Sequence, residues 1–295
     1  MSYRVGHVAL VGRPNVGKST LLNRLLGQKL AITSHKPQTT RHSILGIQSS
    51  DSGQIIYIDT PGIHKRGNKA MNRYLNRTAT AALAGVDLVL FVVEAGHWTE
   101  EDDLVLARLG ESRRPALLVV NKIDTIKPKE RLLPLLDELS RRTGMDDLVP
   151  LSARTGDNCD TLERLILERL PEGAPLYPED QLSDRSERFF AAELIREQLT
   201  RRYHKELPYA VTVEIEQFDE RPHLLRIGAV VWVERPNQKA ILLGKGGAAM
   251  KETASQARQA LEEFFQKKVF LNLWIKVKKS WSSDQASLVK LGYTE

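Results

Sequence analysis

The sequence predicts a doubly wound α/β domain followed by a smaller α+β domain, and three observations support this division. Short apolar runs alternate with helical patterns over the first 170 residues, which is typical of a mostly parallel sheet with crossover helices. The stretch 171–184 contains three prolines and several acidic residues and has no periodicity. Beyond it the order of helices and strands changes, which indicates a second core. We therefore expect domains at 1–172 and 185–295, joined by a linker over 173–184.

Five apolar runs in the first domain have the length and composition of buried strands. These strands are expected at 8–11, 55–58, 88–93, 117–120 and 148–151. Helical patterns follow them at 18–26, 69–83, 101–109, 129–142 and 159–170. Ligands of doubly wound sheets bind at the carboxyl ends of the strands, so we expect the site of this domain there.

The second domain combines helical and strand patterns in a different order. Helices are expected at 185–204 and 247–265, a helical turn at 237–243, and strands at 211–218, 225–234 and 269–279. In the last strand, apolar and polar side chains alternate, so one face should belong to the core and the other should be wet.

Composition limits the possible classes of protein. The 295 residues are 41% hydrophobic and 27% charged, and no run approaches the roughly 18 apolar residues of a membrane-spanning helix. The single cysteine, Cys159, excludes an internal disulfide, so we expect a cytoplasmic protein. The net charge is +6, and residues 185–295 hold 19 basic and 14 acidic side chains. This basic excess favours an anionic partner for the second domain.

A phosphate-binding loop follows the first expected strand. The sequence from Gly12 through Val16 and Gly17 to Lys18 and Ser19 fits the pattern GxxxxGKS and runs into a helix. Its backbone N–H groups can surround the α- and β-phosphates, Lys18 can reach the β- and γ-phosphates, and the Ser19 hydroxyl can bind Mg²⁺. Thr20 follows directly and is included in the expected nucleotide site.

A second element, Asp59-Thr-Pro-Gly62, follows the next strand. Its carboxylate lies where the shell of a bound Mg²⁺ is expected, and Gly62 can turn its N–H toward the γ-phosphate. The polar segment 38–42 can supply a further metal ligand that becomes ordered only with the γ-phosphate and the metal. We favour Thr40 for this role, with Thr39 as the alternative. Lys18, Thr40 and Gly62 are the expected catalytic residues.

The tetrapeptide Asn121-Lys122-Ile-Asp124 follows the strand at 117–120 and predicts the bound base. The Asp124 carboxylate can accept hydrogen bonds from guanine N1–H and the exocyclic amine, whereas adenine presents an acceptor at N1. The segment containing Ser152 and Ala153 follows the last strand and can offer a backbone N–H to the guanine carbonyl. The expected ligands are therefore GTP and GDP.

In their order and spacing, these elements resemble the translation-factor-like class of P-loop GTPases. Ile63 stands where many GTPases carry a glutamine that orients the attacking water, so the resemblance implies slow unaided hydrolysis. Asn15 resembles the asparagine with which several members hold K⁺, so the resemblance implies K⁺ as a further cofactor.

A GxxG loop in the second domain is flanked as in a KH domain. Gly244, Lys245, Gly246 and Gly247 lie between a helical turn and a helix with an apolar stripe. Such a loop clamps the backbone of about four nucleotides of single-stranded RNA. An isolated GxxG is usually a simple turn, but the two helices, the following strand and the basic excess favour the KH interpretation.

Basic side chains near this loop and on the final strand are candidate RNA contacts. Lys251, Lys276 and Lys278 could contact phosphates, and Trp274 and Trp281 could stack on bases. The alternative is that a tryptophan packs in the domain, for example Trp274 under the first helix.

The whole chain resembles the Era family of bacterial ribosome-assembly GTPases, which join a P-loop GTPase domain to a type II KH domain. The motifs that carry the resemblance are Arg-Pro-Asn-Val-Gly-Lys-Ser-Thr, Gln-Thr-Thr-Arg-His, Pro-Glu-Asp before the second domain, Glu-Leu-Pro-Tyr at 206–209 and Leu-Gly-Tyr near the end. The resemblance implies binding to the 3′ end of 16S ribosomal RNA, a role in maturation of the small subunit, and peripheral association with the inner membrane. We expect a monomer.

One feature departs from the family pattern. Ala248, Ala249 and Met250 follow the GxxG loop, where relatives often place another basic residue. The expected consequence is a weaker electrostatic grip of the loop on RNA, with more of the contact made by Lys245, Lys251 and the final strand.

Two other functions remain possible from the sequence. A pure RNA-binding scaffold would carry a degenerate nucleotide site, but Lys18, Ser19, Asp59 and Asp124 are all intact. A GTPase that modifies RNA would need chemistry for which the sequence shows no metal-binding cluster or redox cysteine pair.

Overall fold

The computed structural model describes residues 2–63 and 70–293, and this part of the chain forms two compact units. The first unit contains most of the chain up to Asp184. The second contains the chain from Arg185 onward together with Ser34–Thr39 and residues 70–74. Two short segments that the sequence assigns to the first domain therefore fold with the second unit.

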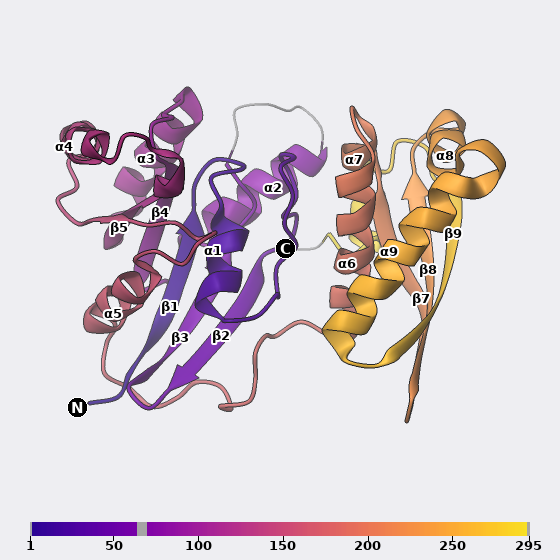
Figure 1. Cartoon of the computed structure of the whole chain (residues 1–295), viewed down its shortest axis with the longest axis horizontal. Helices are drawn as coiled ribbons and strands as arrows, with labels where there is room; N and C mark the ends of the chain where they lie inside the picture. The colour runs from indigo at the N-terminus through magenta and orange to yellow at the C-terminus, as the bar shows by residue number, and fades with distance from the viewer. Residues whose placement is uncertain (1, 64–69, 294–295) are drawn as a thin grey trace. The chain divides into compact units, whose positions relative to one another are not determined.

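The first unit is built on a six-stranded sheet with the order β2-β3-β1-β4-β5-β6 (Figure 1). Its strands are β1 Arg4–Val11, β2 Ile44–Ser50, β3 Gly53–Asp59, β4 Leu88–Glu94, β5 Ala116–Asn121 and β6 Leu148–Pro150. The pairings are parallel except that of β2 with β3. The predicted mostly parallel sheet is confirmed, and all five expected strands are present.

The strand β2 is absent from the sequence-based prediction. It pairs antiparallel with β3 at the edge of the sheet, where only some of its side chains are buried. Its sequence ILGIQSS therefore lacks the continuous apolar run of the central strands. The polar stretch before β3 is shorter than the prediction assumed.

Five α-helices of the first unit follow the predicted ranges closely. They are α1 Lys18–Leu25, α2 Ala70–Ala81, α3 Glu100–Ser112, α4 Leu132–Thr143 and α5 Cys159–Arg169. The first residue predicted for the second helix, at position 69, lies outside the described residues. A short 3₁₀ turn, Lys129–Arg131, replaces the expected start of the fourth helix. Side chains from α2, α3 and α4 pack with those of β1, β4 and β5 in one core.

The chain between 173 and 184 lies along the edge of the first unit. The Ile47 N–H donates to the Leu182 carbonyl at 2.9 Å, and the Gln54 side chain bonds to the backbone of Leu176 and Tyr177 at 2.8 Å each. The Ser183 hydroxyl donates to the Leu45 carbonyl. We call this segment the strap, since β2 and β3 hold it along its length.

The second unit packs helices on a three-stranded sheet. The helices are α6 Glu187–Arg202, α7 Leu207–Ala210, α8 Pro236–Leu243, α9 Ala248–Phe265 and α10 Gln285–Lys290, and the strands are β7 Thr212–Arg221, β8 Leu224–Val233 and β9 Lys268–Val277. The central strand β8 is antiparallel to β7 and parallel to β9. Buried side chains of α6, α9, β8 and β9 form its core. Among the α-helices and strands described for this unit, α7 and α10 are absent from the sequence-based prediction.

Within the ranges 2–63 and 70–293, none of the helices is long and apolar enough to span a bilayer.

Candidate functional site

The loop between β1 and α1 depends on glycine. Gly17 has φ 102°, and a Cβ at this position would lie 2.3 Å from Nδ2 of Asn121. A Cβ at Gly12 would lie 2.3 Å from the Val92 carbonyl oxygen. Only glycine allows the loop to approach β4 and the end of β5 this closely.

The first lysine of α1 is buried in this loop. Lys18 Nζ donates to the carbonyl oxygens of Gly12 at 3.0 Å and Arg13 at 2.9 Å. Burial lowers the pKa of Lys18 to about 8, although the nearby charge of Asp59 acts in the opposite direction. The ammonium group is therefore held by the loop that is expected to surround the phosphates.

Three oxygen-bearing side chains meet beside this loop. The Ser19 hydroxyl lies 2.8 Å from the Thr40 hydroxyl and 2.7 Å from Oδ2 of Asp59. Asp59 is fully buried, and its Oδ1 has no hydrogen-bond partner among the residues that the structure describes. Burial raises the pKa of Asp59, while the hydrogen bonds from Ser19 and Thr40 and the charge of Lys18 act to lower it. Hard oxygen ligands and an unpaired buried carboxylate oxygen fit Mg²⁺. Thr39 lies apart from this group, since its hydroxyl donates to the Lys36 carbonyl at 2.6 Å.

Asn121 joins the phosphate loop to the segment after β6. Its Nδ2 donates to the Val16 carbonyl at 2.8 Å, and its Oδ1 accepts from the N–H of Ala153 at 3.0 Å. The Ser152 N–H donates to the Asp157 carbonyl. Both backbone groups that we expected to face the guanine carbonyl are thus engaged within the protein, where they fix the loop.

The carboxylate of Asp124 lies at the same end of the sheet. It accepts from the Ser152 hydroxyl at 2.6 Å and from Arg154, and the Ser152 hydrogen bond, followed by the charge of Arg154, holds its pKa below the usual range. Ser152 and Arg154 each bond to one oxygen of Asp124, so the orientation of the carboxylate is fixed. A fixed orientation suits a carboxylate that is expected to accept two N–H donors from one edge of guanine.

Sequence reasoning missed two arginines of this region. Arg24, on α1, donates to the carbonyl oxygens of Ala153 at 3.2 Å and Arg154 at 2.6 Å. The side chain of Arg154 is largely exposed and reaches Asp124. No local motif reports these contacts, because Arg24 lies 129 and 130 residues from its acceptors in sequence.

The segment after β3 packs tightly against the phosphate loop. A Cβ at Gly62 would lie 2.6 Å from the backbone nitrogen of Pro14, and the Ile63 N–H donates to the Gly12 carbonyl at 3.3 Å. The Ile63 side chain is fully buried in the core of the first unit. It therefore has no means of orienting an attacking water. Of the remaining expected residues, Asn15 is exposed with φ 66° and Thr20 is half-buried in the first turn of α1.

The GxxG loop of the second unit connects α8 to α9. Gly244, Gly246 and Gly247 have φ values of 69°, 59° and 80°. A Cβ at Gly246 or Gly247 would have no heavy atom within 4 Å, and Lys245 and Lys251 are exposed. The loop thus presents bare backbone and two lysines to solvent, as a clamp on a nucleic-acid backbone requires.

The outward face of β9 carries the other expected RNA contacts. Lys276 donates to Glu216 at 2.8 Å, and the amines of Lys276 and Lys278 lie 5.7 and 6.0 Å from the ring centroid of Trp232. Trp274 is 46% exposed on this face, so it does not pack under the first helix.

For Trp281 the structure agrees with the alternative of packing in the domain and not with base contact. Its ring is fully buried against Tyr293, and its Nε1 donates to the Ala210 carbonyl at 3.1 Å. Its position after the final strand suggested an exposed aromatic side chain, but the chain from 278 to 293 folds back as part of the second core.

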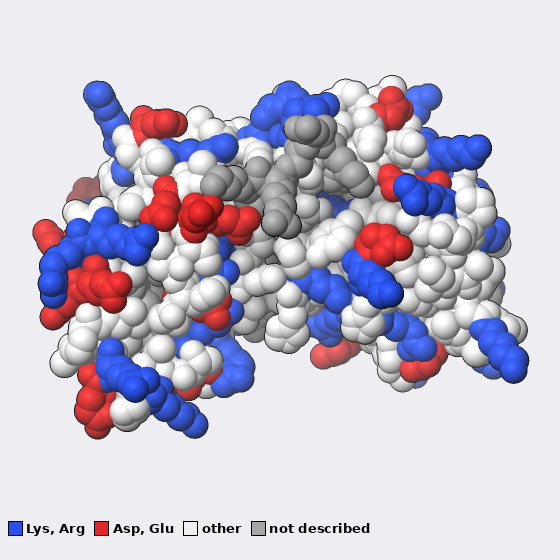
Figure 2. Space-filling view, turned by 90° about the horizontal axis from the view of Figure 1, so that it is seen from above, with Lys and Arg blue, Asp and Glu red and all other residues white. Residues whose placement is uncertain are grey.

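Charge is mixed on the face of the molecule drawn in Figure 2, where Lys and Arg lie among Asp and Glu in both parts of the chain. The basic excess of the C-terminal part therefore does not gather into one broad field on that face.

The fold and the site define a class of protein. A glycine-lined loop before α1, an oxygen cluster suited to Mg²⁺ and an oriented base-reading carboxylate lie on a doubly wound sheet, and a GxxG loop lies in a domain of KH topology. These are the parts of a P-loop GTPase joined to a KH domain.

Comparison with known proteins agrees with this class. Residues 7–122 match the model of a 50S ribosome-binding GTPase family, and residues 206–282 match that of the KH domain. GTPase Era of Azotobacter vinelandii is 55% identical over 294 residues, covering 100% of this chain and 98% of the relative. GTPase Era of Pseudomonas aeruginosa is 54% identical over 290 residues, covering 98% and 95%. The chain belongs to the Era family of GTPases.

Two solved structures are similar over nearly the full length. One is Era in complex with MgGDPNP and nucleotides 1506–1542 of 16S ribosomal RNA, with a TM-score of 0.96 and 38% identity, covering 99% of this chain and 100% of that one. The other is a variant of Aquifex aeolicus Era bound to GDP·AlF4⁻, with a TM-score of 0.95, 38% identity and the same coverage. GTP hydrolysis and the use of GTP, GDP and Mg²⁺ accordingly apply to this family member.

Proposed function

We propose that this protein is a GTP-hydrolysing switch that binds the 3′ end of 16S ribosomal RNA through its KH domain during maturation of the small ribosomal subunit. The observation that carries the proposal is the pairing of an oriented nucleotide site with an exposed GxxG loop in one chain. The similar structure of Era with MgGDPNP and 16S ribosomal RNA supports the choice of RNA.

The division of the chain supports a link between nucleotide and RNA. Thr40, beside Ser19 and Asp59, belongs to the first unit, and the preceding Thr39 belongs to the second, where its carbonyl accepts from Arg196 of α6. A change at Thr40 on loss of the γ-phosphate would thus reach the second unit along one peptide bond. We retain 1–172 as the GTPase domain, 173–184 as the linker and 185–295 as the KH domain.

We propose the following roles for the site residues. Ser19, Thr40 and Asp59 hold Mg²⁺, which supplies positive charge against the phosphates when it is bound. Lys18 and the N–H of Gly62 contact the γ-phosphate, and Asp124 reads guanine. The remaining nucleotide contacts are Gly12, Asn15, Val16, Gly17, Thr20, Asn121, Lys122, Ser152 and Ala153, and the RNA contacts are Gly244, Lys245, Gly246, Gly247, Lys251, Lys276 and Lys278.

Potassium is a further proposal. Asn15 is exposed at the turn of the phosphate loop and resembles the asparagine with which several GTPases of this class hold K⁺. A K⁺ ion there would supply charge that Ile63 cannot. Hydrolysis should be faster in KCl than in NaCl at equal ionic strength, and Asn15→Ala should remove the difference.

Cytoplasmic location, peripheral contact with the inner membrane and a monomeric state also remain proposals. Cell fractionation with a tagged chain would test the first two, and light scattering of the purified protein would test the third.

The proposed function is tested by phosphate release from GTP with and without an RNA oligonucleotide of the 16S 3′ end. We expect release in both cases and a rate that changes with RNA. Lys18→Ala should abolish tight GTP binding, since it removes the ammonium group that is expected to contact the β- and γ-phosphates. An RNA-binding scaffold would release no phosphate, and normal GTP affinity of Lys18→Ala would contradict the phosphate-loop assignment.

A further inference from the structure

We propose that Arg13 is a positioning residue that joins the phosphate loop to Lys122 of the base-binding loop through the carboxylate of Glu94. The inference rests on the proposed nucleotide site, which gives Arg13 and Glu94 no role. It predicts that the phosphate and base ends of the site are aligned by one chain of ion pairs that begins at a buried arginine.

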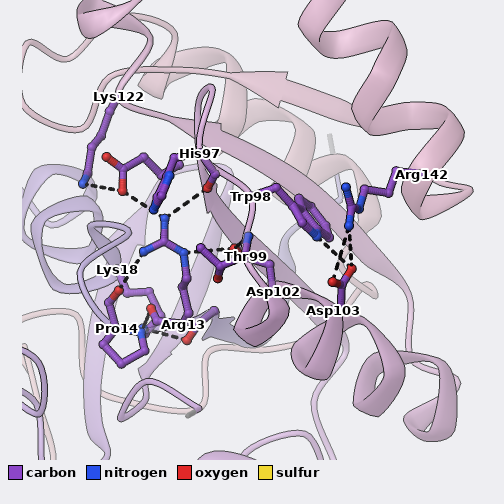
Figure 3. Close-up of polar contacts among 12 residues, drawn as sticks. Arg13, Pro14, Lys18, His97, Trp98, Thr99, Asp102, Asp103, Lys122 and Arg142 are labelled. Carbon is purple, nitrogen blue, oxygen red and sulfur yellow. Dashed lines mark hydrogen bonds and ion pairs between the residues drawn. The ribbon is translucent and has the colours of Figure 1, made fainter. Parts of the chain in front are cut away.

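The Arg13 guanidinium is buried and donates to four groups (Figure 3), of which the Pro14 carbonyl at 3.4 Å is the most distant. Its Nε donates to Oδ2 of Asp102 at 2.9 Å, and its Nη2 donates to Oε2 of Glu94 at 3.0 Å and to the His97 carbonyl at 3.1 Å. The Arg13 carbonyl accepts from Lys18 at 2.9 Å. The same residue therefore supports Lys18 with its backbone and anchors the loop with its side chain.

Glu94 connects this arginine to the other end of the site. It stands at the end of β4, and the oxygen that accepts from Arg13 also lies 3.0 Å from Nζ of Lys122. Burial raises the pKa of Glu94, but the bonds and charges of Lys122 and Arg13 outweigh this effect and lower it. The carboxylate thus stays ionised between two cations that belong to different nucleotide-binding motifs.

The other acceptor of Arg13 is itself fixed. Asp102 is fully buried in the first turn of α3 and accepts from the N–H of Thr99 at 2.9 Å and from its hydroxyl at 3.0 Å. The arginine is therefore anchored to the start of a helix. A guanidinium can bond Asp102 and Glu94 at once, whereas a lysine ammonium lacks the planar fork needed to match both.

Two simpler roles make different predictions. If Arg13 only stabilised the fold, its loss would lower the unfolding midpoint and leave nucleotide release unchanged far below that midpoint. If it only supplied positive charge near the phosphates, lysine would replace it. The chain of contacts through Glu94 instead predicts that neutralising Glu94 alone speeds nucleotide release.

The experiment measures release of fluorescently labelled GDP from the full-length chain by stopped flow. We expect release from Glu94→Gln to be about tenfold faster than from wild type, the scale of coupling through a packed network. The KM for GTP should rise while kcat changes little, because Glu94 is not proposed to touch the reacting atoms. The matched control is Asp103→Asn on α3, which weakens an exposed ion pair with Arg142 of α4 at 3.2 Å (Figure 3) and should leave release unchanged.

A double-mutant cycle separates the chain of contacts from independent effects. We expect Arg13→Lys to speed release and the double variant Arg13→Lys with Glu94→Gln to be no faster than the faster single variant. The proposal would be overturned if Glu94→Gln released GDP at the wild-type rate, or if Arg13→Lys did. It would also be overturned if the accelerations of the two single variants multiplied in the double variant. Thermal unfolding of the nucleotide-free proteins shows whether each variant is folded. If Arg13→Lys is unfolded, the release rate of Glu94→Gln alone tests the proposal. Failure of wild type to bind GDP would instead reject the proposed nucleotide site.

Discussion

At the scale of single residues, the lack of a side chain at Gly17 allows the phosphate loop to pack directly against Asn121 of the base-binding motif. Replacing Gly17 by alanine would place a Cβ 2.3 Å from Asn121 Nδ2, the atom that bonds to the Val16 carbonyl. We expect Gly17→Ala to weaken GDP binding by about 1–3 kcal/mol, a factor of roughly 5 to 150, through strain at this contact. Isothermal titration calorimetry would measure the loss.

Gly27 supplies the matched control, because it has φ 67° but no heavy atom within 4 Å of an added Cβ. Gly27→Ala shares the backbone strain without the collision. Equal GDP affinity for Gly17→Ala and wild type would contradict the described loop.

Asp124 should determine base selectivity. Its carboxylate accepts from Ser152 and Arg154 in the structure, so an asparagine of the same shape can occupy the position. We expect Asp124→Asn to prefer xanthosine over guanosine diphosphate, because the amide can donate to the xanthine carbonyl. Competition between the two nucleotides measures this preference, and an unchanged preference for guanine would remove the assigned role.

Glu94 predicts a dependence of stability on pH. Its pKa is lowered in the folded protein from the ordinary value of 4.5 by Lys122 and Arg13, so the stabilisation is fully present above that pH. It is lost as the pH falls through the folded-state pKa. The free energy of unfolding of wild type should therefore fall more steeply below about pH 4.5 than that of Glu94→Gln. Urea unfolding between pH 3 and pH 6 tests this, and parallel curves for the two proteins would contradict it.

Some contacts of the site could be predicted from the sequence and others could not. The phosphate loop, Asp59 and Asp124 were predicted because each motif is contiguous and follows a strand. Arg13, Arg24 and Arg154 were not assigned roles, since their acceptors lie on other elements. Whether an arginine inside a motif points to a phosphate or to a distant carboxylate depends on packing that local spacing does not encode.

At the scale of elements, the α8–loop–α9 unit has the geometry for its proposed RNA contact. Replacing Gly246 and Gly247 by aspartate should weaken RNA binding at least tenfold, which corresponds to about 1.4 kcal/mol or more. The new carboxylates would repel the phosphates, and the side chains would prevent close approach of the RNA to the loop backbone. GTP hydrolysis without RNA should be nearly unchanged. Fluorescence anisotropy with the 16S oligonucleotide measures the affinity.

Gly144→Asp is the matched control for this loop. Gly144 ends α4 with φ 67° and open space around an added Cβ, but it lies in the first unit. Equal RNA affinity of the double aspartate variant and wild type would reject the KH contact.

The elements differ in how well the sequence predicts them. Central strands such as β4 are continuous apolar runs and were found, while β2 has mixed polarity because it lies at the edge of the sheet. The helices α7 and α10 have four and six residues, too few for a helical period to be distinguished from a turn. Their formation depends on tertiary packing, including the burial of Leu207 and Leu288.

At the scale of the whole molecule, the compact units do not coincide with the linear halves of the chain. Tyr74 meets Tyr293 edge to face at 5.7 Å, and the Met71 N–H donates to the Ser282 carbonyl at 3.1 Å. Arg196 donates to the Thr39 carbonyl, and its guanidinium is buried. The second unit is thus completed by segments from the N-terminal half.

A fragment of residues 185–295 should therefore be looser at its C-terminal end than the same residues in the full chain. We expect faster amide hydrogen exchange in α10 of the fragment, because Tyr74 no longer covers Tyr293. The helix α9, which packs against α6 and β9, serves as the internal reference. Equal exchange of α10 in fragment and full chain would show that the N-terminal segments contribute nothing to this unit.

The strap has a consequence for behaviour at high concentration. An edge strand such as β2 normally offers unpaired backbone groups on which a strand from another molecule can assemble. Here the chain supplies its own cover, since the Leu182 carbonyl occupies the Ile47 N–H and the Ser183 hydroxyl occupies the Leu45 carbonyl. The segment that joins the domains thus also blocks intermolecular β-pairing at this edge of the sheet. Detachment of the strap from β2 should therefore promote aggregation.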